Sequence, residues 1–414
     1  MVEWGYSDLN YQGRCQMKFS TWFTGLRIDN SSMGVDLGRL IACFQTVEDR
    51  RHARGRRYPL WLLLTIAVLG KLAGVNEVRA LAEWASFRRE ELCRLLCFWR
   101  CCLPVVSTWT RVLAQAVDAE DLTSKIYETL RAAGEPVPVR GSVCVAMDGK
   151  ALRGTATANA PGKHLLALYE PVAGQVLSQT EIETKANEIT AAPHVLAKAD
   201  LHGLTVTGDA MFCQRELSTQ IIAAGGDYLW AVKDNQQRLK EAIATVFEPP
   251  SRVSGWGHMP SDLDMATTGY GKGHGRREKR TLWASSLLQG YSSWPGLAQV
   301  FKLETISIDQ HTGKRTETIR FGVTSLPHEL AGAAQLLALV RQHWDIESDL
   351  HYRRDVTFAE DRCHTRMGAS AHLNAILNNT AITLLMRLHQ TNLATARRQA
   401  TLLVERLLAR TCFT

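Results

Sequence analysis

Residues 341–362 read RQHWDIESDLHYRRDVTFAEDR, and this acidic, histidine-containing stretch decides how the rest of the chain is interpreted. Read as a helix, it places Glu347, His351 and Arg354 on one side at four- and three-residue spacing. A carboxylate flanked by imidazoles and a guanidinium is costly in a plain core helix, but it suits a place where a divalent metal meets a phosphodiester. Glu347 is then expected to hold the metal, while His343, His351 and Arg354 hold phosphate oxygens.

Two further carboxylates follow short apolar stretches in the middle of the chain. Residues 142–147 and 204–207 are apolar and rich in β-branched residues, which predicts two buried strands. Asp148 directly follows the first stretch, and Asp209 follows the second after one glycine. Open α/β sheets place their chemistry at the carboxyl ends of such strands. Together with Glu347, these residues predict a cage of three carboxylates, and oxygen ligands of this kind suit Mg²⁺ or Mn²⁺.

The composition is that of a globular protein with sizeable cores. The chain has 414 residues, enough for two or three domains, with 45% apolar and 21% charged residues. Its net charge of +7 permits nucleic-acid binding without proving it. Residues 1–30 contain no secretory signal, the apolar run 60–69 is about half as long as a membrane span, and the cysteines lack paired CxxC spacing. These features predict a reducing cytoplasm and no membrane association.

The N-terminal third predicts a helical domain. Residues 1–40 show no strong periodicity, whereas residues 41–135 read as a small all-helical domain. Its basic run, 49–57, is either a phosphate-contacting arm or a solvated helix start. A helix that begins near residue 107, after a proline-containing turn, is either the second helix of a helix-turn-helix or part of a bundle that packs on the next domain.

The rest of the chain predicts an α/β domain over residues 140–390. Strands are expected at 142–147, 165–169, 176–182, 204–207 and 228–232, with a helix at 214–224. Residues 241–326 read as a β-rich insertion before the Glu347 helix. Its basic loop, 271–277, either touches DNA or is a solvated hairpin turn. Residues 391–414 predict a last, amphipathic helix.

The motifs in this domain resemble those of a known family. In chain order they are Asp148-Gly149-Lys150…Arg153-Gly154, Lys185-x-Asn187-Glu188-Ile189, Gly208-Asp209-Ala210-Met211, Gly226-Asp227-Tyr228, Val232-Lys233-x-Asn235-Gln236, His343-Trp344-x-Ile346-Glu347 and Leu350-His351-x-x-x-Asp355-Val356-x-Phe358-x-Glu360-Asp361. Together they resemble bacterial insertion-sequence transposases of the H-repeat-associated type, in the DDE superfamily. The resemblance covers about residues 40–390. It implies an α/β fold: a ribonuclease H-like mixed sheet flanked by helices, with a β-rich insertion before the catalytic Glu helix and an all-helical N-terminal domain.

The resemblance also implies the roles of individual residues. Asp148, Asp209 and Glu347 match the three catalytic carboxylates, which bind two Mg²⁺ or Mn²⁺ ions. His343 and Arg354 fall where related transposases place an Arg and a Lys. Ser348 and Tyr352 stand where the family usually has Asn and Trp. The expected DNA-phosphate contacts are Lys150, Arg153, Lys185, Lys233, His343, His351 and Arg354.

The implied activity is cutting of DNA at the ends of an insertion sequence, followed by joining of the freed 3′-OH to target DNA. The partners would be double-stranded DNA, as terminal inverted repeats and as target, and a second copy of the chain in a synaptic complex. The protein would lie in the bacterial cytoplasm, at the nucleoid when bound to DNA. Two alternatives remain: a catalytically silent or domesticated DNA-binding derivative, and a host nuclease without strand transfer.

Overall fold

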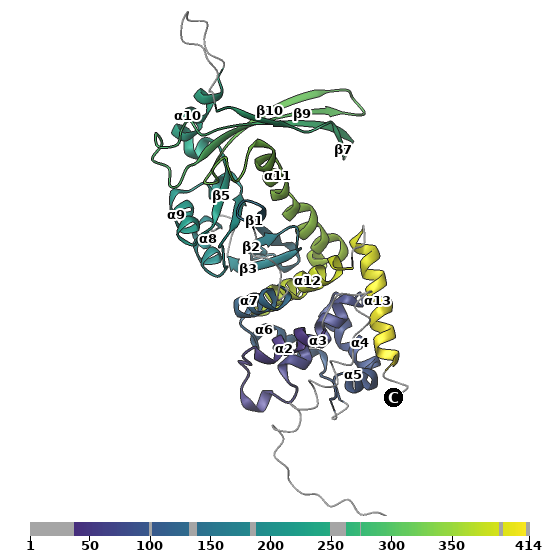
Figure 1. Ribbon diagram of the computed structural model, residues 1–414. Coiled ribbons are helices and arrows are strands. Elements are labelled where there is room, and N and C mark those ends of the chain that lie inside the picture. The colour runs from purple at the N-terminus through teal and green to yellow at the C-terminus, as the bar shows by residue number, and fades with distance from the viewer. Residues whose placement is uncertain are drawn as a thin grey trace, which may run out of the picture.

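A computed structural model describes most of the chain. The described residues are 37–98, 102–131, 139–182, 188–248, 262–273, 275–388 and 392–410. The predictions made for the first 36 residues and for Lys185 therefore lie outside the described part. The expected α/β fold is confirmed, with its ribonuclease H-like mixed sheet, its β-rich insertion and its N-terminal helices (Figure 1).

The first five strands form the mixed half of the sheet. In sheet order they are β3 (Gln175–Ile182), β2 (Lys163–Glu170), β1 (Val143–Leu152), β4 (Leu204–Gly208) and β5 (Asp227–Val232). The first three are antiparallel to one another, and β4 and β5 run parallel to β1. The predicted strands are all present, because their apolar residues fill both faces of a sheet that helices cover.

One predicted strand boundary is wrong, and the difference positions the site. The sequence places the end of β1 at Met147, but β1 continues to Leu152. Its parallel ladder with β4 stops at the pair Met147↔Gly208, whereas its antiparallel ladder with β2 continues to Leu152↔Lys163. Asp148 therefore lies inside a strand, at the point where that strand loses one of its two neighbours.

The insertion extends the same sheet. Its strands are β6 (Asp264–Thr267), β7 (Gly271–Gly273), β8 (Arg276–Ser285), β9 (Gln299–Asp309) and β10 (Arg315–Thr324). β10 pairs with β5, so ten strands of the described residues form one sheet in the order β3-β2-β1-β4-β5-β10-β9-β8-β6, with β7 beside β8. Figure 1 shows β9 and β10 reaching beyond the helices that cover the rest of the sheet.

Helices cover both faces of the sheet. On one face, α8 (Glu188–Ala197), α9 (Arg215–Ala223) and α10 (Gln237–Phe247) share a core with Val145 and Met147 of β1. On the other face, α11 (Ala333–His343) packs against Cys144. Since side chains alternate along a strand, Asp148 is on the α11 face.

The stretch that carries Glu347 is helical, but it is not the continuous α-helix that its spacing predicts. α11 ends at His343, and two π-helical segments follow, η6 (Ile346–His351) and η7 (Arg353–Thr357). A π-helix closes hydrogen bonds between residues five apart, and such segments are frequent at functional sites. Buried Ile346 and Leu350 anchor η6 in the core.

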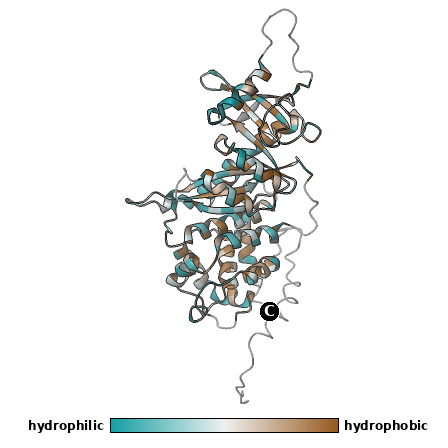
Figure 2. Ribbon diagram, turned by 90° about the vertical axis from the view of Figure 1, so that its left-hand side faces the viewer, coloured by the Kyte–Doolittle hydropathy of each residue, from teal (hydrophilic) through white to brown (hydrophobic). Residues whose placement is uncertain are grey.

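The N-terminal helices and the C-terminal helices pack together. The first group is α2 (Leu37–Thr46), α3 (Leu60–Leu72), α4 (Val78–Phe87), α5 (Arg89–Leu95), α6 (Val106–Gln115) and α7 (Ala119–Leu130); the second is α12 (Ser370–Met386) and α13 (Leu393–Arg410). One hydrophobic cluster includes residues of both groups and of η6. In Figure 1, α12 lies between the sheet and the N-terminal helices, with α13 beside α3 and α5. In Figure 2, apolar positions run through the helical layer and the sheet alike.

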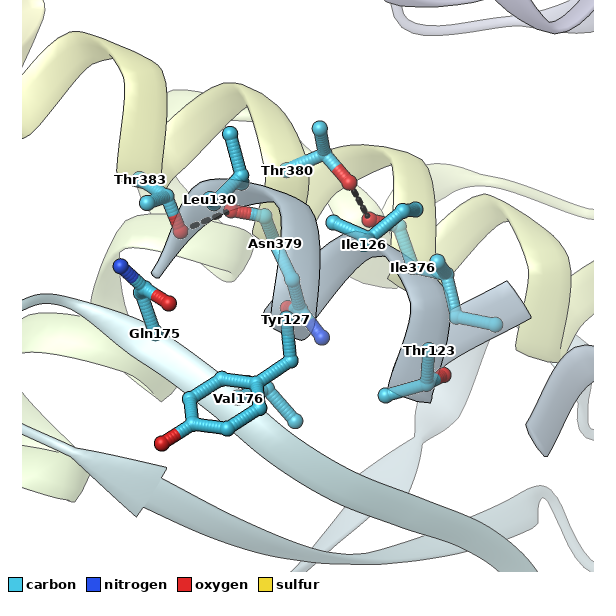
Figure 3. Close-up of a pocket in the computed structure, with 10 residues that line it drawn as sticks. All are labelled: Thr123, Ile126, Tyr127, Leu130, Gln175, Val176, Ile376, Asn379, Thr380 and Thr383. Carbon is cyan, nitrogen blue, oxygen red and sulfur yellow. Dashed lines mark hydrogen bonds between the residues drawn. The ribbon is translucent and has the colours of Figure 1, made fainter. Parts of the chain in front are cut away.

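The seam between α7, β3 and α12 contains a small pocket. Its volume is about 20 Å³, enough for a single water molecule. Figure 3 shows the side chains that line it, among them Tyr127, Gln175 and Asn379. None of its lining residues belongs to the acidic group around Glu347. Of the described helices, none has both the length and the apolar character needed to cross a lipid bilayer.

Arg397 of α13 connects three parts of the chain. Its guanidinium donates to the carbonyl of Thr357 and, at 2.5 Å, to Asn76 Oδ1, and it lies 4.3 Å from the centre of the Phe358 ring. It also donates to the carbonyl of Lys71 at 3.2 Å. Hydrogen bonds from a buried charge are each worth about 1.5–3 kcal/mol.

We expect Arg397→Ala to lower the free energy of unfolding by about 2–4 kcal/mol, because it leaves several carbonyls of this junction without their donor. Arg398→Ala is the matched control, since Arg398 is the exposed neighbour and, among the described residues, donates a hydrogen bond to Thr395 of its own helix. Urea denaturation followed by circular dichroism measures both. Equal midpoints for the two variants would contradict this role of Arg397.

Candidate active site

The register of two parallel strands brings Asp148 and Asp209 side by side. Each follows directly after one member of the last parallel pair, Met147↔Gly208. Neighbouring strands lie about 4.8 Å apart, so the two carboxylates start from adjacent positions on the sheet. The Asp148 side chain is 18% exposed and that of Asp209 is 52% exposed. The structure therefore gathers two of the three predicted carboxylates at one edge.

Glu347 and His351, both in η6, lie close to Asp148. His351 Nδ1 lies 3.6 Å from Asp148 Oδ2 and 3.6 Å from Glu347 Oε2. Donor atoms of Asp148, Glu347 and His351 all lie within 4.8 Å of one another, an arrangement able to hold a metal ion. Asp209 is placed beside this group by the register and lies 4.0 Å from His343 Nε2.

The electrostatics of the group reflect its burial and its crowding of acids. Burial raises the pKa of Asp148 to about 7, and the nearby carboxylates of Glu347, Glu188 and Asp209 add to this, while the Gly149 N–H opposes it. The contact with the His351 imidazole is the largest cause that lowers the pKa of Glu347 to about 2. Closely placed carboxylates repel one another when they are all ionised, and a bound cation reduces that repulsion. The donor set therefore fits a divalent metal.

Two of the expected phosphate contacts are buried in ion pairs instead. Lys150 Nζ lies 2.6 Å from Asp355 Oδ2, and the Lys150 side chain is only 7% exposed. Arg354 is fully buried, and its Nε donates to Glu360 Oε2 at 2.7 Å. In this conformation neither cation is exposed. The phosphate contacts expected for Arg354 from helical spacing and for Lys150 from the resemblance therefore stay predictions that this arrangement does not support.

The π-helical geometry explains the position of Arg354. In an α-helix, residues seven apart share a face, which is why the sequence places Arg354 beside Glu347. In a π-helix, with hydrogen bonds between residues five apart, the turn is wider and residues seven apart diverge. Arg354 consequently turns into the interior, where Asn378 supports Glu360 through a 2.9 Å hydrogen bond to Oε1.

The remaining predicted contacts differ in accessibility. His343 is 13% exposed at its side chain, and its Nδ1 lies 3.1 Å from Thr207 Oγ1. His351 is 7% exposed. Arg153 is 83% exposed at its side chain, just beyond the end of β1. Lys233 is exposed at the carboxyl end of β5, the same edge that carries Asp209. Among the members of the predicted set that the structure describes, Arg153 and Lys233 are thus the two cations that solvent, and therefore DNA, can reach.

Several motif residues act by positioning the strand ends, which the sequence did not indicate. Asn235 Nδ2 donates to the Ala210 carbonyl at 2.7 Å, and so ties the turn after β5 to the loop that carries Asp209. Gly149 provides space instead of a hydrogen bond. A Cβ at this position would come within 2.2 Å of Glu188 Oε1, so any larger residue would have to displace the buried Glu188 carboxylate of α8.

Asp227 is a further positioning residue. It is buried at the start of β5, where Arg140 donates two hydrogen bonds to it, at 2.7 and 2.9 Å. Ser325, just after β10, donates a third, at 2.8 Å. The motif around Asp227 drew attention to this residue, but its partners are 87 and 98 residues away and only the fold identifies them.

The site thus lies on an α/β sheet whose central parallel pair ends beside two carboxylates. The family model described as "Transposase DDE domain" matches residues 139–384, and a model described as "DDE_Tnp_1-associated" matches residues 41–128. The chain belongs to this transposase DDE-domain family.

Curated relatives agree with this assignment. The chain is 32% identical to "Putative protein YbfL" and 31% identical to "H repeat-associated putative transposase YhhI", both of Escherichia coli K12; each match covers 58% of this chain and 63% of the relative. "Putative transposase YncI" of Escherichia coli O157:H7 is 28% identical over 84% of this chain and 87% of its own length. The chain thus spans a little under two thirds of the first two relatives.

The raised pKa of Asp148 predicts a pH-dependent stability in metal-free protein. A raised folded-state pKa stabilises the fold at low pH, and this contribution is lost as pH rises through about 7. We expect wild type to lose about 1 kcal/mol more than Asp148→Asn between pH 6 and pH 8, because Asn does not titrate. Urea denaturation in EDTA at both pH values measures this.

The control for that comparison is Asp234→Asn. Asp234 is an exposed acid at the same edge whose pKa is lowered by its Lys240 partner, so it is ionised at both pH values. Its variant should follow wild type from pH 6 to pH 8. A pH dependence shared by all three proteins would rule out Asp148 as the cause.

Proposed function

We propose that the protein is a DNA transposase that cuts DNA at the ends of an insertion sequence and joins the freed 3′-OH to target DNA. The observation that supports this most directly is the register at Met147↔Gly208, from which Asp148 and Asp209 start at adjacent positions, with donor atoms of Asp148 and Glu347 within 4.8 Å of each other. Membership of the transposase DDE-domain family supports the same reaction.

The three carboxylates would hold divalent cations, expected as two Mg²⁺ or Mn²⁺ ions. Bound there, the metal supplies a nucleophile at neutral pH and stabilises the charge that develops on the leaving 3′ oxygen. Asp148 must lose its proton before it can bind a cation, so the protein's own acid sets the lower pH limit of binding. Glu347, already ionised because of the His351 contact, accepts a cation without that cost.

The partner is double-stranded DNA, both as terminal inverted repeats and as target. Arg153 and Lys233 are exposed near the carboxylates, and each would contact a backbone phosphate as a charge-assisted donor. Bringing two ends together for joining calls for a pair of active sites, so the working assembly is a homodimer. The setting for this reaction is the bacterial cytoplasm, at the nucleoid.

Cleavage should require Asp148. We expect Asp148→Ala to reduce nicking of a supercoiled plasmid that carries the element ends by about 1,000-fold or more with Mg²⁺, because it removes a carboxylate that stabilises transition-state charge. Gel-shift affinity for the same DNA should stay within about threefold of wild type, since phosphate contacts from other residues supply it.

Asp234→Ala serves as the matched control, since it removes an exposed acid at the same edge and should cleave like wild type. Full cleavage by Asp148→Ala would remove that residue from the mechanism. A wild-type protein that binds the ends without cutting them would favour the catalytically silent alternative, and cutting without a joined product would favour a nuclease.

The two exposed cations should act through DNA affinity. Arg153→Ala and Lys233→Ala should each weaken DNA binding about equally for all sequences and reduce the slope of log K against log salt by about 1. Lys150→Met should leave that slope unchanged, because Lys150 is buried against Asp355. Fluorescence anisotropy between about 50 and 200 mM salt measures the slopes. A change with Lys150→Met alone would reverse the assignment.

A further inference from the structure

We propose that His351 is a direct ligand of the metal, through Nδ1, so that the site has a mixed nitrogen and oxygen donor set and favours Mn²⁺ over Mg²⁺. The inference rests on the proposed metal-dependent function and deepens it, since three carboxylates alone account for that function. It assigns to His351 a role other than the phosphate contact expected from the sequence.

The distances fit ligation better than a hydrogen bond. His351 Nδ1 is equally far, 3.6 Å, from one oxygen of Asp148 and one of Glu347. At 3.6 Å, neither contact is a hydrogen bond of ordinary length. Two donors that share one ion at about 2.1 Å lie between about 3.0 Å and 4.2 Å apart, depending on the angle between them. Both nitrogen–oxygen separations therefore fall within the range that one shared cation allows, and the three donors lie within 4.8 Å of one another.

The burial of His351 excludes the simpler roles. With 7% of its side chain exposed, the imidazole is too deep to reach a phosphate outside the group. Its other nitrogen, Nε2, has no hydrogen-bond partner among the described residues, so a polar network does not explain its presence in the interior. Leu350 and His351 are both buried in η6, and Nδ1 is the ring nitrogen that faces the acids.

The surrounding cations are already committed to other partners. Lys150 pairs with Asp355 at 2.6 Å, and Arg354 pairs with Glu360 at 2.6 Å. Neither side chain is therefore placed to neutralise Asp148 and Glu347 in the way an internal ion pair would. The acids and the imidazole are therefore available to bind an external cation. A nitrogen ligand favours a transition-metal ion over Mg²⁺ and Ca²⁺, which prefer oxygen ligands.

His343 provides a matched comparison. It is a half-buried histidine near the acids, but its Nδ1 is engaged with Thr207 Oγ1 at 3.1 Å, and its Nε2 lies 4.0 Å from the carboxylate of Asp209. Two histidines thus lie beside the acids. A ring nitrogen of His351 lies between two carboxylates, whereas His343 lies near one.

The test uses the full-length, metal-free protein without DNA, loaded with Mn²⁺ alone. Pulsed electron paramagnetic resonance detects a nitrogen bonded to Mn²⁺ by its hyperfine coupling, and ¹⁵N-histidine labelling identifies the nitrogen as imidazole. We expect this coupling in wild type and in His343→Gln, and its loss in His351→Gln. Calorimetry should show Mn²⁺ binding about tenfold weaker or more in His351→Gln, with Mg²⁺ binding changed by less than about threefold.

The outcomes separate this inference from the proposed function. Mn²⁺ bound to wild type without nitrogen coupling overturns the ligand role of His351 and leaves metal-dependent cleavage intact. No Mn²⁺ binding at all overturns both. Coupling that persists in His351→Gln, or that disappears in His343→Gln, also overturns the assignment. If His351→Gln does not fold, as judged by circular dichroism, the labelled wild type and His343→Gln still decide the question.

Discussion

The parallel pairing of β1 with β4 is the constraint on which the candidate site depends. Its last pair, Met147↔Gly208, sets two chain segments about 60 residues apart in a fixed register, and each segment delivers a carboxylate at the next position. A slip of one residue would send Asp148 to the face covered by α8 and α9. The larger Val145 and Met147 pack in the core on one face of β1, and the smaller Cys144 and Ala146 pack on the other. A slip would exchange them, so the packing on either side determines where the acids lie.

A second layer of interactions fixes the π-helical stretch over those acids. Two side-chain contacts connect this stretch to β1. His351 contacts Asp148, and Asp355 pairs with Lys150, which lies two residues beyond Asp148 in the strand. Arg354 and Glu360 form a buried pair behind them, with Asn378 of α12 attached. Removing one partner of a buried ion pair leaves the other charge without compensation, which is costly. These contacts therefore fix the position of Glu347 relative to the sheet.

Much of this arrangement follows from the sequence, and its limits have physical reasons. Alternating and continuous apolar runs predicted the strands, and the two acidic strand ends with the Glu347 stretch predicted which residues would meet. The continuation of β1 to Leu152 was missed, because the polar residues 148–150 break the apolar pattern although the strand keeps β2 as its neighbour. The ion pairs of Lys150 and Arg354 were not foreseen, because the sequence spacing does not distinguish a π-helix from an α-helix and because Asp355 is 205 residues from its partner Lys150.

The pairing of β10 with β5 makes the insertion a continuation of the sheet rather than an attached module. Each added strand turns by about 20–25° relative to its neighbour, so β8, two strands beyond β10, is rotated by about 40–50° from it. The direction in which the outer strands point is therefore set by the twist of the central strands, because all of them belong to one continuous sheet. Adding or deleting a strand of the insertion would rotate the outer strands by about 20–25° relative to the central sheet, while Asp148 and Asp209 would keep their positions.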